Sequence, residues 1–120
     1  GMPGAQTTVA VMLDHVANGR LSLARLVDLL CSGPQRSFNI AGKGRIAQGY
    51  DADFTLVDLK AKREIASDWL AYKCGWSPYE GMNITGWPMG TIIRGNVVMR
   101  DGELADDPVG EPVRFMETLG

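Results

Sequence analysis

Residues 91–102 read TIIRGNVVMRDG and decide the fold class, because two tight turns separate short apolar runs. Gly95-Asn96 and Asp101-Gly102 are dipeptides that readily take the positive φ of two-residue hairpin loops. The pattern predicts paired antiparallel strands over 91–94 and 97–100, with positive φ at both glycines. We therefore expect the sheet to end in a meander.

Upstream of this meander the strand pattern is weaker. Residues 54–59 form a short apolar run that predicts one strand. Residues 60–87 carry several turn signals, so we expect mostly loop there, with a weak strand near 63–66. The aromatic residues of this stretch are expected in a core or an interface; they are Trp69, Tyr72, Trp76, Tyr79 and Trp87.

The first 40 residues have helical periodicity instead. Residues 7–17 predict an amphipathic helix that begins at Thr7 or Thr8 and stops at Asn18-Gly19. A second helix is predicted after Ser22 as N-cap, and Pro34 opens a further helical turn. The predicted apolar positions are Val9, Met12, Leu13 and Val16 in the first helix and Leu23, Leu26, Val27 and Leu30 in the second.

These elements together predict an α+β chain. We expect two or three helices over 1–40, sheet over 41–105 and a polar, loosely held tail over 106–120. In that tail, four apolar side chains have a chance of docking: Val113, Phe115, Met116 and Leu119.

Charge and length exclude several functions. The net charge of -2 comes from 14 acidic and 12 basic residues that are scattered along the chain, so no basic stripe predicts nucleic-acid binding. No apolar run is long enough for a membrane span, and residues 1–30 lack the pattern of a signal peptide. We expect a cytoplasmic protein with neither nucleic-acid nor membrane partners. Its 120 residues are far fewer than the roughly 250 of a catalytic barrel.

Few residues are suited to catalysis. His15 is the only histidine, whereas a zinc site takes three or four ligands, so we expect a surface histidine beside Asp14 and no metal site. No serine lies in a G-x-S-x-G elbow. We predict no catalytic residue in this chain.

Other polar features are better explained by turns. Gly42-Lys43-Gly44 lacks the spacing of a phosphate loop. Asp51 and Asp53 flank Ala52 before a strand, where carboxylates usually stabilise turns, although paired carboxylates also serve acid–base chemistry. Cys31 and Cys74 lack a C-x-x-C spacing, and we expect them to be semi-buried free thiols.

Residues 43–58, KGRIAQGYDADFTLVD, resemble the KG-x-I-x-x-G-x-DAD segment of the amidohydrolase superfamily. Two further stretches, PGAQT at 3–7 and SPYEG at 77–81, are similar to segments of class I dihydroorotases. The resemblance runs from about Met2 to Leu104.

The resemblance implies a C-terminal piece of a zinc-dependent cyclic amidohydrolase. The helices would be the end of its TIM-like barrel, and the strands would complete a composite β-sandwich. The zinc ligands of that family lie upstream, so zinc would be a cofactor of the full-length enzyme only. By resemblance, Pro3 and Gly4 would lie beside the substrate, although a rigid helix entry explains them equally well.

The implied reaction interconverts N-carbamoyl-L-aspartate and dihydroorotate in pyrimidine synthesis. Hydantoinase and allantoinase remain alternatives within the superfamily. A third alternative is a non-catalytic structural partner of aspartate carbamoyltransferase. For the intact protein we expect a small-molecule substrate and a homo-oligomer. The fragment by itself would leave an apolar helix face and open strand edges exposed, and we expect these to be covered by another copy, by rearranged packing or by upstream chain.

Overall fold

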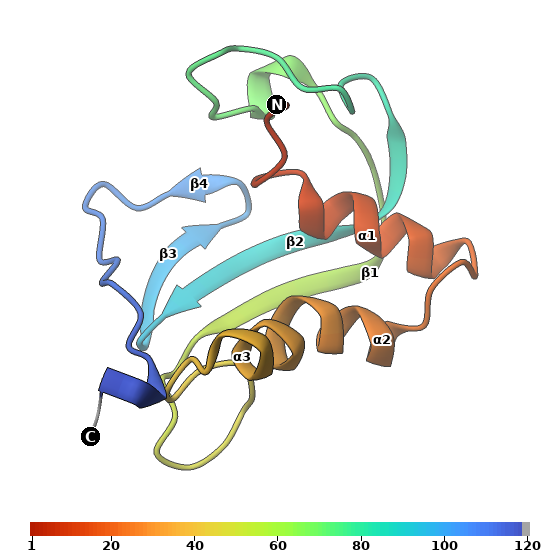
Figure 1. The fold of residues 1–120 in the computed structure, drawn as a ribbon. Coiled ribbons are helices and arrows are strands. Elements are labelled where there is room, and N and C mark those ends of the chain that lie inside the picture. Colours follow the sequence, from red (N-terminus) through yellow and green to blue (C-terminus); the bar gives the residue numbers. More distant parts are fainter. Residues whose placement is uncertain (119–120) are drawn as a thin grey trace.

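The computed structural model describes residues 1–118 and shows short helices beside one antiparallel sheet (Figure 1). The sheet is a four-stranded meander of order β1-β2-β3-β4. Its strands are β1 (Phe54–Glu64), β2 (Asn83–Ile93), β3 (Asn96–Arg100) and β4 (Glu103–Leu104). The predicted α+β class is confirmed. No helix in the described part is long and apolar enough to cross a membrane.

The two hairpin turns occur in the predicted region, with one shift. Asp101 and Gly102 have φ of 50° and 86° and join β3 to β4, as predicted. The first turn is formed by Arg94 and Gly95, with φ of 46° and 80°, one residue earlier than predicted. Asn96 belongs to β3, and its side-chain amide donates to the carbonyls of Ile93 and Arg94, which closes the turn.

The prediction of mostly loop over 60–87 was wrong at both ends, because β1 runs to Glu64 and β2 begins at Asn83. Two bulges in the β1–β2 pair disturb the alternation of apolar and polar residues by which a regular strand is predicted from sequence. One interrupts the β1–β2 register between Asp58 and Lys62, where the Asp58 carboxylate accepts from the N–H groups of Lys60 and Ala61. The other lies near Pro88, in keeping with the tolerance of proline at bulges. Only the middle of the segment is irregular, around the 3₁₀ turn η2 (Ser67–Trp69).

The core lies between the first helix and the sheet. It consists of Ala10, Ile65, Ile84 and Trp87, which are almost fully buried. Trp69 packs against Trp87 with ring centroids 4.6 Å apart. The aromatic residues therefore do not share one environment, because Trp87 is in the core whereas Trp76 is 45% exposed.

The helices begin and end close to the predicted residues. Helix α1 (Thr8–Ala17) ends at Asn18, and α2 (Leu23–Val27) starts after Ser22, whose hydroxyl accepts from the Arg25 N–H at 3.1 Å. The chain continues through a π-helical turn, η1 (Asp28–Ser32), into α3 (Gly33–Phe38), with Pro34 in its first turn. The N-cap at Ser22 and the role of Pro34 are thus confirmed.

The predicted apolar faces are only partly buried. Leu13 and Leu26 are buried as expected, but Leu23 and Leu30 are 41% and 38% exposed. In α1 the buried side chains are those of Ala10 and Leu13, while Val9, Met12 and Val16 are half-buried. The reason is the contact of α1 with β2, which selects the Ala10–Leu13 side (Figure 1).

The tail is held more firmly than predicted. Arg94 donates to the Val109 carbonyl at 2.6 Å, and the Ala41 N–H donates to the Arg114 carbonyl at 2.8 Å. Ile40 and Phe115 form an antiparallel bridge, just before the turn η3 (Met116–Thr118). The tail up to η3 therefore returns to the end of α3 (Figure 1). Leu119 lies outside the described residues.

Candidate functional site

The predicted substrate-facing residues lie in the loop that enters α1. Pro3 and Gly4 are half-buried. The Gly4 carbonyl accepts from the Thr8 N–H at 3.1 Å and from the Thr8 hydroxyl at 2.7 Å, so it already belongs to the first helical turn. These contacts fix the direction in which the Pro3–Gly4 backbone leaves the helix.

Gln6 joins this loop to a distant part of the chain. Its Nε2 donates to the Trp69 carbonyl at 2.7 Å, and its Oε1 accepts from the Ala71 N–H at 2.8 Å. Its own backbone N–H donates to the Tyr72 hydroxyl at 2.7 Å. We call this set of three hydrogen bonds the Gln6 clamp. The sequence signal for it was the PGAQT stretch, but the partners of Gln6 are not deducible from spacing.

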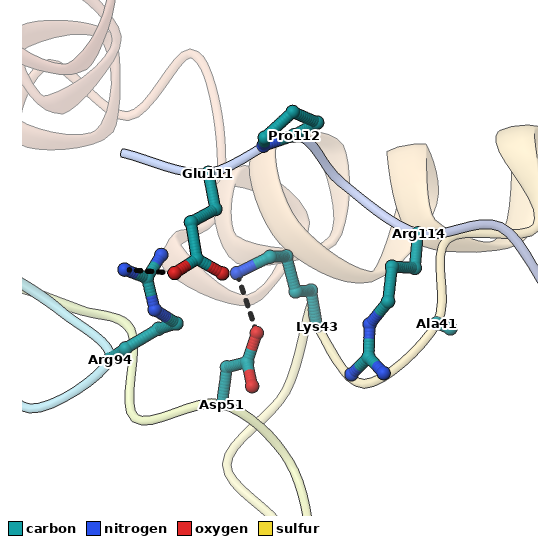
Figure 2. Close-up of a pocket in the computed structure, with 7 residues that line it drawn as sticks. All are labelled: Ala41, Lys43, Asp51, Arg94, Glu111, Pro112 and Arg114. Carbon is teal, nitrogen blue, oxygen red and sulfur yellow. Dashed lines mark ion pairs between the residues drawn. The ribbon is translucent and has the colours of Figure 1, made fainter. Parts of the chain in front are cut away.

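A second polar site is a small cavity of about 220 Å³ beside the tail. Figure 2 shows Lys43, Arg94 and Arg114 approaching it together with Asp51 and Glu111. The Lys43 ammonium pairs with Asp51 at 2.9 Å and also with Asp53, while Arg94 pairs with Glu111 at 3.1 Å. These opposite charges largely neutralise one another, so the arrangement is a set of structural ion pairs.

The carboxylates of the DAD segment stabilise turns, as the sequence favoured. Asp53 Oδ1 accepts from the Arg94 N–H at 2.9 Å, which links residues 51–53 to the β2–β3 turn. The Asp51 N–H donates to the Gly42 carbonyl at 2.8 Å. Arg94 and Glu111 were not predicted for this site, because their contacts depend on the return of the tail.

The ion pairs shift two pKa values. The hydrogen bond to Asp53 raises the pKa of Lys43 above its ordinary 10.5, with a smaller contribution from Asp51 and against the effect of burial. For Asp53, burial alone would raise the pKa, but the hydrogen bonds from Lys43 and from the Arg94 N–H outweigh it. The pKa of Asp53 therefore lies below its ordinary 3.8.

The residues described here do not fit a zinc site. His15 Nδ1 accepts from the Arg20 guanidinium at 2.7 Å, and Asp14 accepts from the Thr85 N–H at 2.9 Å. Within residues 1–118, no three His, Cys, Asp or Glu side chains are grouped so that they could hold a metal ion. His15 is the helix-surface residue beside Asp14 that the sequence predicted.

The expectation of semi-buried thiols was wrong. Cys31 and Cys74 are both exposed and free. Cys31 lies in the π-helical turn and Cys74 in the loop before β2. Both are therefore surface thiols of this chain.

Comparisons with known proteins all lead to the same family. Residues 4–98 match the model of the amidohydrolase family. A dihydroorotase of Methanothermobacter thermautotrophicus is 43% identical over 88% of this chain and 25% of its own length. An allantoinase of Desulfitobacterium hafniense is 36% identical over 95% of this chain and 26% of its own length.

Solved structures agree with this result. An L-hydantoinase (dihydropyrimidinase) from Arthrobacter aurescens superposes with a TM-score of 0.81 at 35% identity, over 88% of this chain and 24% of that one. The chain thus spans about a quarter of the length of the relatives that it matches. On the match over residues 4–98 and these relatives, the chain belongs to the amidohydrolase family.

Proposed function

We propose that this chain is the C-terminal part of a dihydroorotase, which interconverts N-carbamoyl-L-aspartate and dihydroorotate. The observation that carries the proposal is the 43% identity, over 88% of the chain, to a protein named dihydroorotase. Pyrococcus furiosus supplies a second dihydroorotase, 42% identical over 94% of the chain. The identity to the allantoinase is lower, 36% over 95% of the chain.

In this proposal the chain supplies scaffold and one wall of the site, and catalysis depends on residues outside it. The side chains of residues 1–118 support this division, because they form no group of ligands for zinc. Zinc would be held by the rest of the enzyme and supply Lewis acidity there. Helices α1 to α3 would end a barrel, and the β-strands would join a composite sandwich. The intact enzyme would be a cytoplasmic homo-oligomer.

Pro3 and Gly4 are the residues that we propose for the substrate wall. Their position supports this role, since the Gly4 carbonyl is engaged by Thr8 and the backbone direction is fixed before the ligand arrives. A preorganised backbone loses less conformational entropy on binding than a flexible one. Glycine also lets backbone groups approach a ligand closely.

A second candidate is a hydantoinase or an allantoinase. The superposition on L-hydantoinase and the 36% identity to an allantoinase favour it. All three enzyme types open a cyclic amide, so the choice concerns the substrate and not the kind of reaction.

The test is an assay of the complete polypeptide that contains residues 1–120. The zinc-loaded protein is assayed with dihydroorotate, a 5-substituted hydantoin and allantoin. We expect kcat/KM for dihydroorotate to exceed the other two values by about a hundredfold or more, as a site built to pair with substrate polar groups achieves. A preference for hydantoin or allantoin would establish the second candidate. Inactivity with all three, together with binding to aspartate carbamoyltransferase, would show a non-catalytic partner.

A further inference from the structure

The Gln6 clamp uses both ends of one side-chain amide. Nε2 donates to the Trp69 carbonyl and Oε1 accepts from the Ala71 N–H, with distances of 2.7 and 2.8 Å. Trp69 and Ala71 are two residues apart, so the amide pairs with the backbone as a neighbouring strand would. Only a carboxamide offers a donor and an acceptor side by side without titrating. The interaction is therefore specific to glutamine at this length.

The partners of the clamp are themselves anchored to the core. Trp69 packs on the buried Trp87 of β2 at 4.6 Å between ring centroids. Leu70, between the two clamped backbone groups, packs against the same core cluster. The loop that receives Gln6 is thus fixed to the sheet, although it has little regular secondary structure of its own.

Gln6 is also close in the chain to the Pro3–Gly4 loop that precedes α1. Gln6 follows Gly4 by two residues, and the Gly4 carbonyl is tied to Thr8. The backbone N–H of Gln6 is held as well, by the Tyr72 hydroxyl at 2.7 Å. A short path therefore runs from the core through the ring contact of Trp69, the hydrogen bonds of Gln6 and two residues of backbone to Gly4.

We propose that Gln6 is a positioning residue for the substrate wall: its amide, paired with the backbone of Trp69 and Ala71, holds the Pro3–Gly4 segment in register with the bound cyclic amide. This inference rests on the proposed function, because it assigns a role at the same site. Gln6 does not touch the reacting atoms in this scheme. It acts through the position of the backbone two residues before it.

The kinetic test uses the complete, zinc-loaded polypeptide and two substitutions. Gln6→Ala removes the two side-chain bonds of the clamp and keeps the backbone N–H bond to Tyr72. We expect kcat/KM to fall about 10- to 100-fold, mainly through KM, since a displacement of about 1 Å at a site has effects of this size. Gln48→Ala is the matched control, because Gln48 is an exposed glutamine in the turn before Asp51. It should leave both constants unchanged, and zinc content should be the same in all three proteins.

Gln6→Glu adds a readout that a merely structural role would not produce. An ionised carboxylate accepts from Ala71 but cannot donate to Trp69, whereas the protonated acid does both. The ratio of kcat/KM for this variant to that of the wild type should therefore rise as the pH is lowered through the carboxyl range. The same ratio for Gln48→Glu should stay flat.

Hydrogen exchange separates the possible failures. The Ala71 amide should be protected in the wild type and exchange at least about tenfold faster in Gln6→Ala, as expected when its acceptor is lost. If that amide is unprotected in the wild type, or if it loses protection while KM and kcat stay unchanged, the positioning role is wrong. A wild type that is inactive on every cyclic amide overturns the proposed function and this inference with it. If the wild type is active and Gln6→Ala has the same kcat and KM as the wild type, this inference alone is overturned.

Discussion

Leu13 of α1 lies directly over Gly86 of β2, so closely that a Cβ on Gly86 would come within 2.7 Å of the Leu13 Cβ. The φ of Gly86 is +98°, which other residues rarely adopt. Next to this contact, the Thr85 N–H donates to the Asp14 carboxylate at 2.9 Å. The helix is therefore docked at a position where the strand offers no side chain.

Gly86→Ala should destabilise the fold by about 2 to 4 kcal/mol, because it adds both backbone strain and a clash with the helix. Gly49→Ala is the matched control, since Gly49 has φ of +83° but a Cβ there would meet nothing within 4 Å. It should cost only about 1 kcal/mol of strain. Urea unfolding measures both. Equal losses in the two variants would show that the helix does not press on β2 there.

Asp53→Asn tests the ion pair with Lys43, because an asparagine Oδ1 still accepts from the Arg94 N–H. The partial exposure of this pair screens it, so we expect a loss of about 1 kcal/mol or less near pH 7. The folded-state pKa of Asp53 is lowered, so its contribution is present above the ordinary value of 3.8 and is lost as the pH falls through the folded pKa.

The difference in the free energy of unfolding between wild type and Asp53→Asn should therefore shrink as the pH falls below about 4, in line with that linkage. Asp106→Asn, at an exposed tail position, is the control and should change little at any pH. Denaturant titrations from about pH 7 into the acid range below 3.8 provide the measurement. A difference that grows on acidification would contradict the assigned direction.

The sequence predicted those parts of the fold that depend on local chemistry. The Ser22 cap, the Asn18 stop and the Asp101-Gly102 turn each follow from residues that are close neighbours in the chain. The extent of β1 and β2 does not, because the bulges at Asp58 and Pro88 depend on how two strands far apart in the sequence are paired.

The candidate site divides in the same way. The assignment of Pro3 and Gly4 to the substrate wall rests on a motif and stays a prediction, whereas the turn-forming role of Asp53 follows from its position before a strand. The clamp of Gln6 on Trp69 and Ala71 requires the loop before β2 to fold back over the helix start, and no periodicity in the sequence encodes that contact.

The 120-residue chain should bind no stoichiometric zinc and hydrolyse no dihydroorotate on its own. His15 is occupied by Arg20, and the described residues contain no group of three metal-ligating side chains. Equilibrium dialysis with elemental analysis measures the first point, and an assay with excess zinc measures the second. One tightly bound zinc per chain, absent in His15→Gln, would contradict this expectation.

The isolated chain should also self-associate through β1. This strand pairs only with β2 among the described strands, and its exposed apolar side chains lie on both faces. Leu56 and Leu59 are 51% and 44% exposed, which is typical of a strand that is covered in its working assembly. Covering a side chain of this size contributes about 1.5 to 3 kcal/mol.

Sedimentation should therefore show species larger than the 13.0 kDa monomer, in proportions that rise with concentration. Leu56→Lys places a charge on the open strand and should shift the equilibrium toward monomer, because an edge lysine opposes strand addition. Ile46→Lys is the control, since Ile46 is 84% exposed but lies in the loop before the sheet. A wild type that stays monomeric at millimolar concentration would contradict the prediction, because β1 would then remain exposed to solvent without a partner. Association that is weakened equally by both substitutions would place the contact on general apolar surface and not on the strand edge.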